Sequence, residues 1–191
     1  MARRRKNIQL VLDEPRAFTG FKARLVNFTN VRNYLALVGP ECKELDGILG
    51  YYGEQLVLLA QSLGLNSCWV GGTFKVVNRA YNVDLGQKLA AVVALGYGAT
   101  QGVPHRSKAP QEVAPGYDGA PEWFKRGVDA ALLAPTALNQ QKFSFSLDGE
   151  ENDVPVVRAS TKRGAFTQMD LGIAQCHFEI GAGNALYRWA E

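Results

Sequence analysis

The segment that most limits how this chain can fold is KLAAVVALGYG, residues 88–98. Residues 89–95 are all apolar and show no alternation of apolar and polar positions. A strand with one wet face alternates with a period of two, whereas a strand that is apolar throughout is buried on both faces. We therefore expect a central strand inside a sheet that has covering layers on both sides.

Several other segments are expected to be strands. NIQLVL (7–12) and KFSFSL (142–147) alternate, and NYLALVG (33–39) is more fully apolar. SCWVGG (67–72) is a short apolar segment closed by two glycines, and VPVVRA (154–159) follows the polar turn DGEEND. Residues 99–119 are rich in proline, glycine and charge and are expected to form a long connection.

Three segments are expected to be helices. Residues 45–63 have helical spacing, and Gly64 stands where a left-handed cap would end the helix. The residues of this segment that share one apolar face are Ile48, Tyr52, Leu56, Leu59 and Leu63. Pro121 at a first helical position and Pro135 after the end bound a second helix. Asp170 is expected to be the N-cap of a third, residues 171–187. The prediction is an α+β fold with a mixed β-sheet flanked by helices.

Length and composition narrow the class of protein. The chain has 191 residues, 47% hydrophobic and 20% charged, which suits one globular domain over 1–191 with a basic arm at 1–6. A net charge of +3 does not imply a nucleic-acid partner, and no apolar run predicts a membrane span. The three cysteines are an odd number at wide spacings, which favours a reducing cytoplasm over a disulfide framework. Neither the cysteines nor the two histidines have the spacing of a metal site.

The stretch LLAPTALNQQKFSF, residues 132–145, places neutral polar side chains where a helix gives way to a strand. Its amides and hydroxyl come from Thr136, Asn139, Gln140 and Gln141. Such groups suit a ligand rich in carbonyls, ring nitrogens and hydroxyls, because each can match a donor or an acceptor. The alternative is a helix end followed by solvated loop residues, and residue types alone leave both interpretations open.

Four stretches, in their order along the chain, resemble motifs of the nitroreductase family. GYYGEQLVLLAQSLGLNSCWVGG (50–72) resembles the family's helix and following segment, and ALGYG (94–98) with a downstream Arg/Lys pair resembles its strand and tail. APTALNQQKF (134–143) resembles the Ala-Pro-Ser-x-x-Asn-x-Gln-Pro-Trp signature, and DLGIAQCHFEIGAG (170–183) resembles the C-terminal helix. The order of the motifs resembles that of the Thermotoga-type subgroup, and the resemblance covers roughly residues 7–190.

The resemblance implies an oxidoreductase that binds flavin mononucleotide (FMN), with NAD(P)H as reductant and a nitroaromatic, quinone or similar electron-poor acceptor. It also implies a homodimer with FMN at the subunit interface. Because the chemistry is centred on the flavin, no catalytic side chain is implied. The cofactor-binding residues that the resemblance implies are Pro135, Thr136, Asn139, Gln140, Gln141, Trp69, Gly71, Gly72, Arg106 and Lys108.

These residues have different implied roles. The 135–141 segment would contact the ribityl chain and the ring. Gly71 and Gly72 would let a backbone N–H approach flavin N5, where hydride arrives. Arg106 and Lys108 would neutralise the phosphate. Each assignment has a structural alternative. Trp69, Gly71 and Gly72 could be a buried tryptophan before a turn, and Arg106 and Lys108 could be solvated charges in a loop.

One departure from the family concerns the start of the chain. Relatives begin with a helix whose Arg-x-Ser-x-Arg motif holds the FMN phosphate, whereas MARRRK has arginines without that spacing. We expect either a truncated gene product or a basic arm that substitutes for the missing motif. The alternative function is therefore a non-catalytic or weakly flavin-binding protein that keeps the fold, and a nucleic-acid binder using the arm is a third, weaker alternative.

Overall fold

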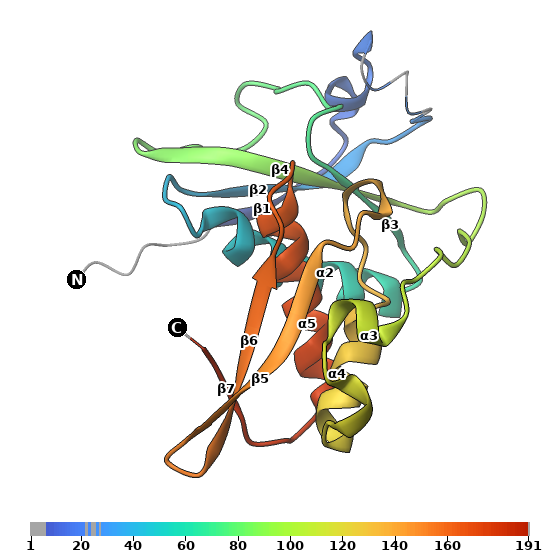
Figure 1. The fold of residues 1–191 in the computed structure, drawn as a ribbon. Coiled ribbons are helices and arrows are strands. Elements are labelled where there is room, and N and C mark those ends of the chain that lie inside the picture. The colour runs from blue at the N-terminus through green and yellow to red at the C-terminus, as the bar shows by residue number, and fades with distance from the viewer. Residues whose placement is uncertain (1–6, 22, 24–25, 27, 191) are drawn as a thin grey trace. The chain divides into compact units, whose positions relative to one another are not determined.

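The computed structural model describes residues 7–21, 23, 26 and 28–190, so the basic arm of residues 1–6 lies outside the described residues (Figure 1). The chain divides into two compact units. The first contains Met1–Leu49 and Gly53–Gly102, and the second contains Gly50–Tyr52 and Val103–Glu191. The organisation of residues 1–191 as a single domain stays a prediction.

The first unit is built on a four-stranded antiparallel sheet in the order β1-β2-β4-β3 (Figure 1). Its strands are β1 (Asn7–Val11), β2 (Asn33–Pro40), β3 (Asn66–Val70) and β4 (Gln87–Gly96). β4 pairs with β2 on one side and β3 on the other, and Ala91, Val92, Val93 and Ala94 are all buried. The prediction of a central strand buried on both faces is confirmed, because only an interior strand can hide every side chain in such a run.

A core of the first unit gathers around Tyr34 on β2. The ring of Phe18, from the short helix η1 (Pro15–Phe18), meets Tyr34 edge-on at a centroid distance of 5.7 Å and Phe28 at 5.2 Å. Edge-to-face contacts of this kind add to the burial of apolar area. The core therefore lies between the sheet and the segments that follow β1 and β3.

Helix α2 (Leu45–Ser62) forms where helical spacing predicted it, and Gly64 follows it with φ of 79°, as expected of a left-handed cap. Its buried positions are Leu45, Leu49, Gly50, Gly53, Glu54, Val57 and Ala60. The apolar face named from the sequence is the outer one, since Leu59 is 53% and Leu63 66% exposed. The helix is apolar on both sides, so periodicity did not identify the side that packs.

The second unit holds a mixed three-stranded sheet in the order β5-β6-β7. β5 (Phe143–Glu151) and β6 (Val154–Thr161) form an antiparallel hairpin, and β7 (Arg188–Trp189) runs parallel to β6. The fold class is α+β with a nitroreductase-like arrangement, as predicted, although the described strands form two sheets where one mixed sheet was expected.

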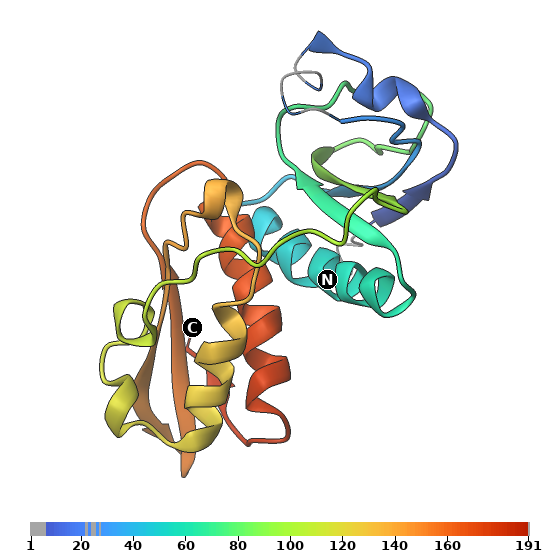
Figure 2. The same cartoon turned by 90° about the vertical axis from the view of Figure 1, so that its right-hand side faces the viewer.

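Helices α4 (Glu122–Ala131) and α5 (Thr167–Ala182) lie side by side, and α5 packs against the sheet of the second unit (Figure 2). They approach closely because small residues stand at the contact. A Cβ on Gly127 would meet the Phe178 ring at 2.8 Å, and one on Gly181 would meet the Arg126 carbonyl oxygen at 2.3 Å. Phe178 is fully buried and stacks on Phe145 of β5 at 4.7 Å, which joins the helices to the sheet.

Several features differ from those predicted. α5 begins at Thr167 after Phe166, so Asp170 lies inside its first turn and is not the N-cap; it ends at Ala182 because Gly183 leaves the helical region. Pro121 is the N-cap of α4 and not its first residue. The 99–119 connection contains two short helices, α3 (Pro110–Val113) and η2 (Tyr117–Gly119). The preference of an aspartate for the N-cap competes with burial, and burial places Asp170 inside α5.

Candidate functional site

The polar segment of residues 136–141, called here the polar junction, folds as a tight turn with unusual backbone angles. Its middle is a single 3₁₀ turn, η3 (Ala137–Asn139). Leu138, Asn139 and Gln141 have φ of 53°, 52° and 42°. Each non-glycine residue in this left-handed region costs about 1–2 kcal/mol, so three of them within four positions need strong surrounding contacts.

Part of that support comes from a second segment, residues 106–108. The Gln141 side chain accepts from the Lys108 backbone N–H at 2.9 Å and donates to the Arg106 carbonyl oxygen at 2.8 Å. Lys108 Nζ donates to the Gln141 carbonyl oxygen at 2.7 Å. Asn139 also donates to the Arg106 carbonyl oxygen, at 2.8 Å. The structure thus brings together two sets of implied cofactor-binding residues that lie far apart in the sequence.

These bonds occupy the side-chain amides of Asn139 and Gln141. Gln141 is 2% exposed, and its amide nitrogen donates to Asn139 Oδ1 at 2.7 Å as well as to Arg106. The Gln141 backbone N–H donates to Thr136 Oγ1 at 3.1 Å. Polar groups that leave water must find partners, and neutral amides supply donors and acceptors without the desolvation cost of a charge. The polar residues at this junction therefore first satisfy the protein's own backbone.

The charged side chain next to the junction remains available to a ligand. Within the described ranges, the exposed Arg106 guanidinium makes no hydrogen bond or ion pair, and its backbone is held by Asn139 and Gln141. The preceding His105 lies 3.4 Å from the Leu133 carbonyl oxygen, and Ser107 donates to the Leu132 carbonyl oxygen at 3.0 Å. A cation with solvent access is thus fixed at its backbone beside a polar turn, an arrangement that suits an anionic group.

Asp170 is a part of this site that sequence reasoning assigned to a different role. It is 4% exposed; Oδ1 accepts from the Ala137 backbone N–H at 3.0 Å, and Oδ2 accepts from Gln140 Nε2 at 2.7 Å. Burial raises the pKa of the carboxyl, and the two hydrogen bonds oppose that rise. The sequence did contain a signal for this role. Helical spacing places Asp170 on the same, buried side of α5 as Ile173 and Ala174.

Trp69, Gly71 and Gly72 belong to the first unit. Trp69 Nε1 donates to Glu54 Oε2 at 2.9 Å, and Glu54 is a carboxylate only 1% exposed. The Trp69 ring also lies over Gly53, where a Cβ would meet it at 2.6 Å. Gly72 is exposed and is not among the described glycines with positive φ. Pro135, in the second unit, is half-buried just before the polar junction.

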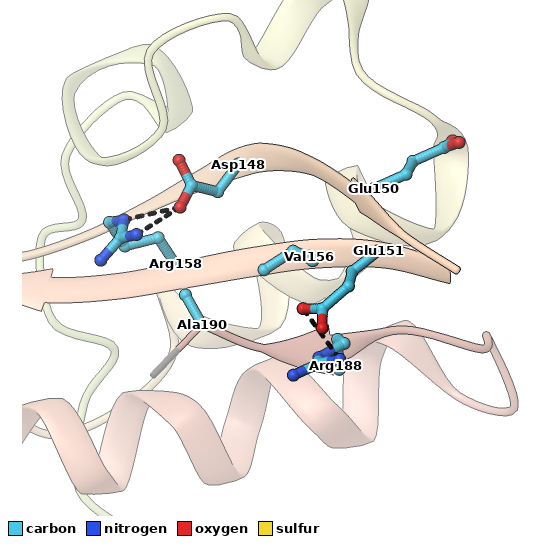
Figure 3. A pocket seen from close by; sticks show the side chains of 7 residues that line it. All are labelled: Asp148, Glu150, Glu151, Val156, Arg158, Arg188 and Ala190. Carbon is cyan, nitrogen blue, oxygen red and sulfur yellow. Dashed lines mark hydrogen bonds and ion pairs between the residues drawn. The ribbon is translucent and has the colours of Figure 1, made fainter. Parts of the chain in front are cut away.

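A pocket of about 400 Å³ lies elsewhere in the second unit, along the β5–β6 hairpin and β7 (Figure 3). Four of its charged residues form two pairs: Arg158 Nε donates to Asp148 at 3.0 Å, and Arg188 lies 2.9 Å from Glu151 (Figure 3). None of its lining residues was implied by the sequence. The pocket therefore adds nothing to the site at the polar junction.

In the described part of the chain, no three His, Cys, Asp or Glu side chains group closely enough to hold a metal ion. None of the helices in that part combines the length and apolarity that crossing a membrane requires.

Comparison with known proteins gives one sequence family and one solved fold. The family model described as "Putative TM nitroreductase" matches residues 2–182. A crystal structure titled as a putative nitroreductase from Thermotoga maritima MSB8 matches with a TM-score of 0.60 and 19% identity, over 93% of this chain. This chain spans 65% of the length of that one. No curated protein sequence matches.

Proposed function

The chain belongs to the family described as "Putative TM nitroreductase", and from that membership we propose that it is an FMN-dependent oxidoreductase. It would use NAD(P)H to reduce nitroaromatics, quinones or similar electron-poor acceptors. FMN, when bound, supplies the redox chemistry by taking hydride from the nicotinamide and passing electrons to the acceptor.

The observation that carries the proposal is the network between the polar junction and residues 106–108. Asn139 and Gln141 hold the Arg106 carbonyl, and Lys108 is fixed to Gln141. The implied ring-and-ribityl segment and the implied phosphate pair are therefore neighbours in one unit of the structure. A ligand with a polar chain ending in a phosphate fits such a pair of segments.

The residues present fit the cofactor, and each would have a different role. Arg106 is the cation with solvent access and would meet the phosphate; Lys108, half-buried and bonded to the Gln141 carbonyl, would add its charge. Thr136 and Gln140 would offer their remaining hydroxyl proton and carbonyl oxygen to the ribityl hydroxyls and ring. Asn139 and Gln141 would act by shaping the turn rather than by touching the ligand.

In the first unit, the pair of Trp69 and Glu54 fixes the end of β3 just before Gly71 and Gly72. Two residues without side chains leave the backbone N–H groups open to close approach by a flat ring. We propose that one of them donates to flavin N5. No acid or base side chain is assigned, because water can deliver the protons that this chemistry consumes.

A homodimer and a reducing compartment complete the proposal. The outer face of α2 exposes Leu59 and Leu63 by 53% and 66%, and contiguous apolar side chains of this kind mark protein interfaces. The three cysteines Cys42, Cys68 and Cys176 are all free, which supports a cytoplasmic location.

One observation favours the alternative of a non-catalytic or weakly flavin-binding protein. The side chains of Asn139 and Gln141 already have partners within the protein, so they add little direct affinity for a ligand. In that case the motif would preserve the turn alone. The two functions differ in whether the purified protein binds FMN and turns over NAD(P)H.

The test is a flavin titration of two arginine variants. The purified protein is expected to show flavin absorption bands, or to acquire them with added FMN, and to oxidise NADH with a quinone acceptor. Arg106→Ala is expected to weaken FMN binding about 10- to 100-fold, the loss of a charge-assisted hydrogen bond. Arg126→Ala removes another exposed arginine, on α4, and is expected to leave binding unchanged. Absence of FMN binding by the wild type would leave the non-catalytic alternative.

A further inference from the structure

Asp170 connects the first turn of α5 to both ends of η3. Its Oδ1 accepts from the Ala137 N–H at 3.0 Å, where the turn begins, and its Oδ2 accepts from Gln140 Nε2 at 2.7 Å, where the turn ends. Gln140 Nε2 also donates to the Ala165 carbonyl oxygen at 3.0 Å, just before α5. A single carboxylate thus holds the two flanks of residues 137–140.

The turn between those flanks is strained. Leu138 and Asn139 both have left-handed φ, at 53° and 52°. Leu138 is 102% exposed, so packing of its side chain does not hold it in that conformation. Strained residues persist only where their surroundings over-determine them. The surroundings here are hydrogen bonds: Asp170 on one side, and the Asn139 and Gln141 bonds to Arg106 on the other.

We infer that Asp170 is a positioning residue of the flavin site, acting through Gln140 and the Ala137 N–H to hold the turn that faces the cofactor. The inference rests on the proposed function for its flavin part. It adds a residue that does not touch the ligand and that the family motif of residues 134–143 does not contain.

The chemistry of the site needs a carboxylate. Two donors converge on the two oxygens, and an asparagine would offer one acceptor and point an NH₂ group at the other donor. Burial raises the pKa of Asp170, so the ionised form costs folding free energy instead of supplying it. The contribution of the carboxylate is therefore to geometry, and the experiment separates geometry from stability.

The experiment compares Asp170→Asn with Asp129→Asn in the full chain. Asp129, on α4, is an exposed carboxylate that accepts from the Tyr117 hydroxyl at 2.8 Å, so the control also loses a charge and a hydrogen-bond acceptor. Three readouts are taken: the urea unfolding midpoint, amide hydrogen exchange of residues 137–141 without ligand, and the FMN dissociation constant from flavin fluorescence.

At neutral pH, the neutral asparagine avoids the cost of a buried charge, which offsets the lost hydrogen bond, so Asp170→Asn is expected to keep its unfolding midpoint. It is expected to exchange the amides of 137–141 at least about tenfold faster, and to bind FMN about 10- to 100-fold more weakly. Asp129→Asn is expected to change none of the three. Unchanged exchange and unchanged FMN affinity in Asp170→Asn would overturn the inference, as would an effect on exchange spread over the whole unit.

A second variant, Gln140→Leu, removes the donor of the Gln140–Asp170 hydrogen bond. It tests the same inference if Asp170→Asn does not fold. In the double variant, the two effects on exchange are expected to be less than additive, because both variants lose the Gln140–Asp170 hydrogen bond. Full additivity would overturn the assigned route. If the wild type bound no FMN, the proposed function and the flavin part of the inference would both fall, while local exchange would still decide whether Asp170 holds the turn.

Discussion

Asn139 donates its side-chain amide to the backbone carbonyl oxygen of Arg106 across 2.8 Å, joining positions 33 residues apart. The same carbonyl accepts from Gln141. An arginine whose backbone is held by two amides presents its guanidinium from a fixed place, which lowers the entropy lost when an anion binds. If the protein binds FMN as proposed, the amides of this motif would act on the ligand through a neighbouring segment.

The first prediction concerns Asn139→Ala. The variant loses the bonds to Arg106 and Gln141. The free energy of FMN binding is therefore expected to become less favourable by about 1–3 kcal/mol, so that less flavin is retained. Flavin content after purification and titration measures it. Gln111→Ala is the control, because the Gln111 side chain is exposed and donates to Asp118 on the surface. Equal flavin occupancy in the two variants would contradict the assignment.

The second prediction concerns Trp69→Phe. Phenylalanine keeps most of the ring but removes the N–H that Glu54 Oε2 accepts at 2.9 Å inside the first unit. A buried carboxylate that loses a donor is expected to cost about 1–3 kcal/mol of unfolding free energy. Urea denaturation measures it, with Trp123→Phe as the matched change in the second unit. A loss no greater than that of Trp123→Phe would show that the bond contributes nothing.

The third prediction concerns Gly72→Val. A branched side chain would keep a flat ring from the backbone N–H, so NADH oxidation with a quinone is expected to fall about 10²-fold while far-UV circular dichroism stays the same. Gly119→Val is the control, since a Cβ there would meet nothing within 4 Å. Full turnover in a folded, flavin-bound Gly72→Val protein would remove Gly72 from the site.

The fourth prediction concerns Leu138→Gly. Glycine adopts a φ of 53° without the steric cost that leucine bears, and the exposed leucine side chain loses no packing. After the larger chain entropy of unfolded glycine is subtracted, stability is expected to rise by about 0.5 kcal/mol. Leu133→Gly is expected to lower it, because Leu133 is also exposed but does not have positive φ. A fall in the urea midpoint for both variants would show that Leu138 is not strained.

The fifth prediction concerns the pH dependence of stability at Asp170. The pKa is raised in the folded protein above its ordinary value of 3.8, so the folded state binds the proton more readily than the unfolded state. The stability of the wild type relative to Asp170→Asn is therefore expected to be highest below that value and to fall as pH rises through the folded pKa. Urea unfolding of both proteins between pH 4 and 7.5 measures the difference. A difference that grows with pH would mean that hydrogen bonding outweighs burial.

Local patterns in the sequence were sufficient for most of the elements. The unbroken apolar run at 89–95 predicted β4 as an interior strand, because no other place hides every side chain. The periodicity of 45–63 and Gly64 predicted α2 and its end. The sequence also placed Asn139 and Arg106 in two candidate segments, without showing that one holds the other.

Tertiary contacts decided the rest. α2 is apolar on two sides, and the packed side is the one where Gly53 admits the Trp69 ring, a contact between residues distant in the chain. Asp170 has a side chain that suits an N-cap, yet it lies buried inside the first turn of α5, where it accepts from Gln140 and the Ala137 N–H. The amides of Asn139 and Gln141 could equally have met solvent or a ligand. Side-chain types in the sequence set which hydrogen bonds are possible, and only the fold, by removing particular groups from water, determines which of them must form.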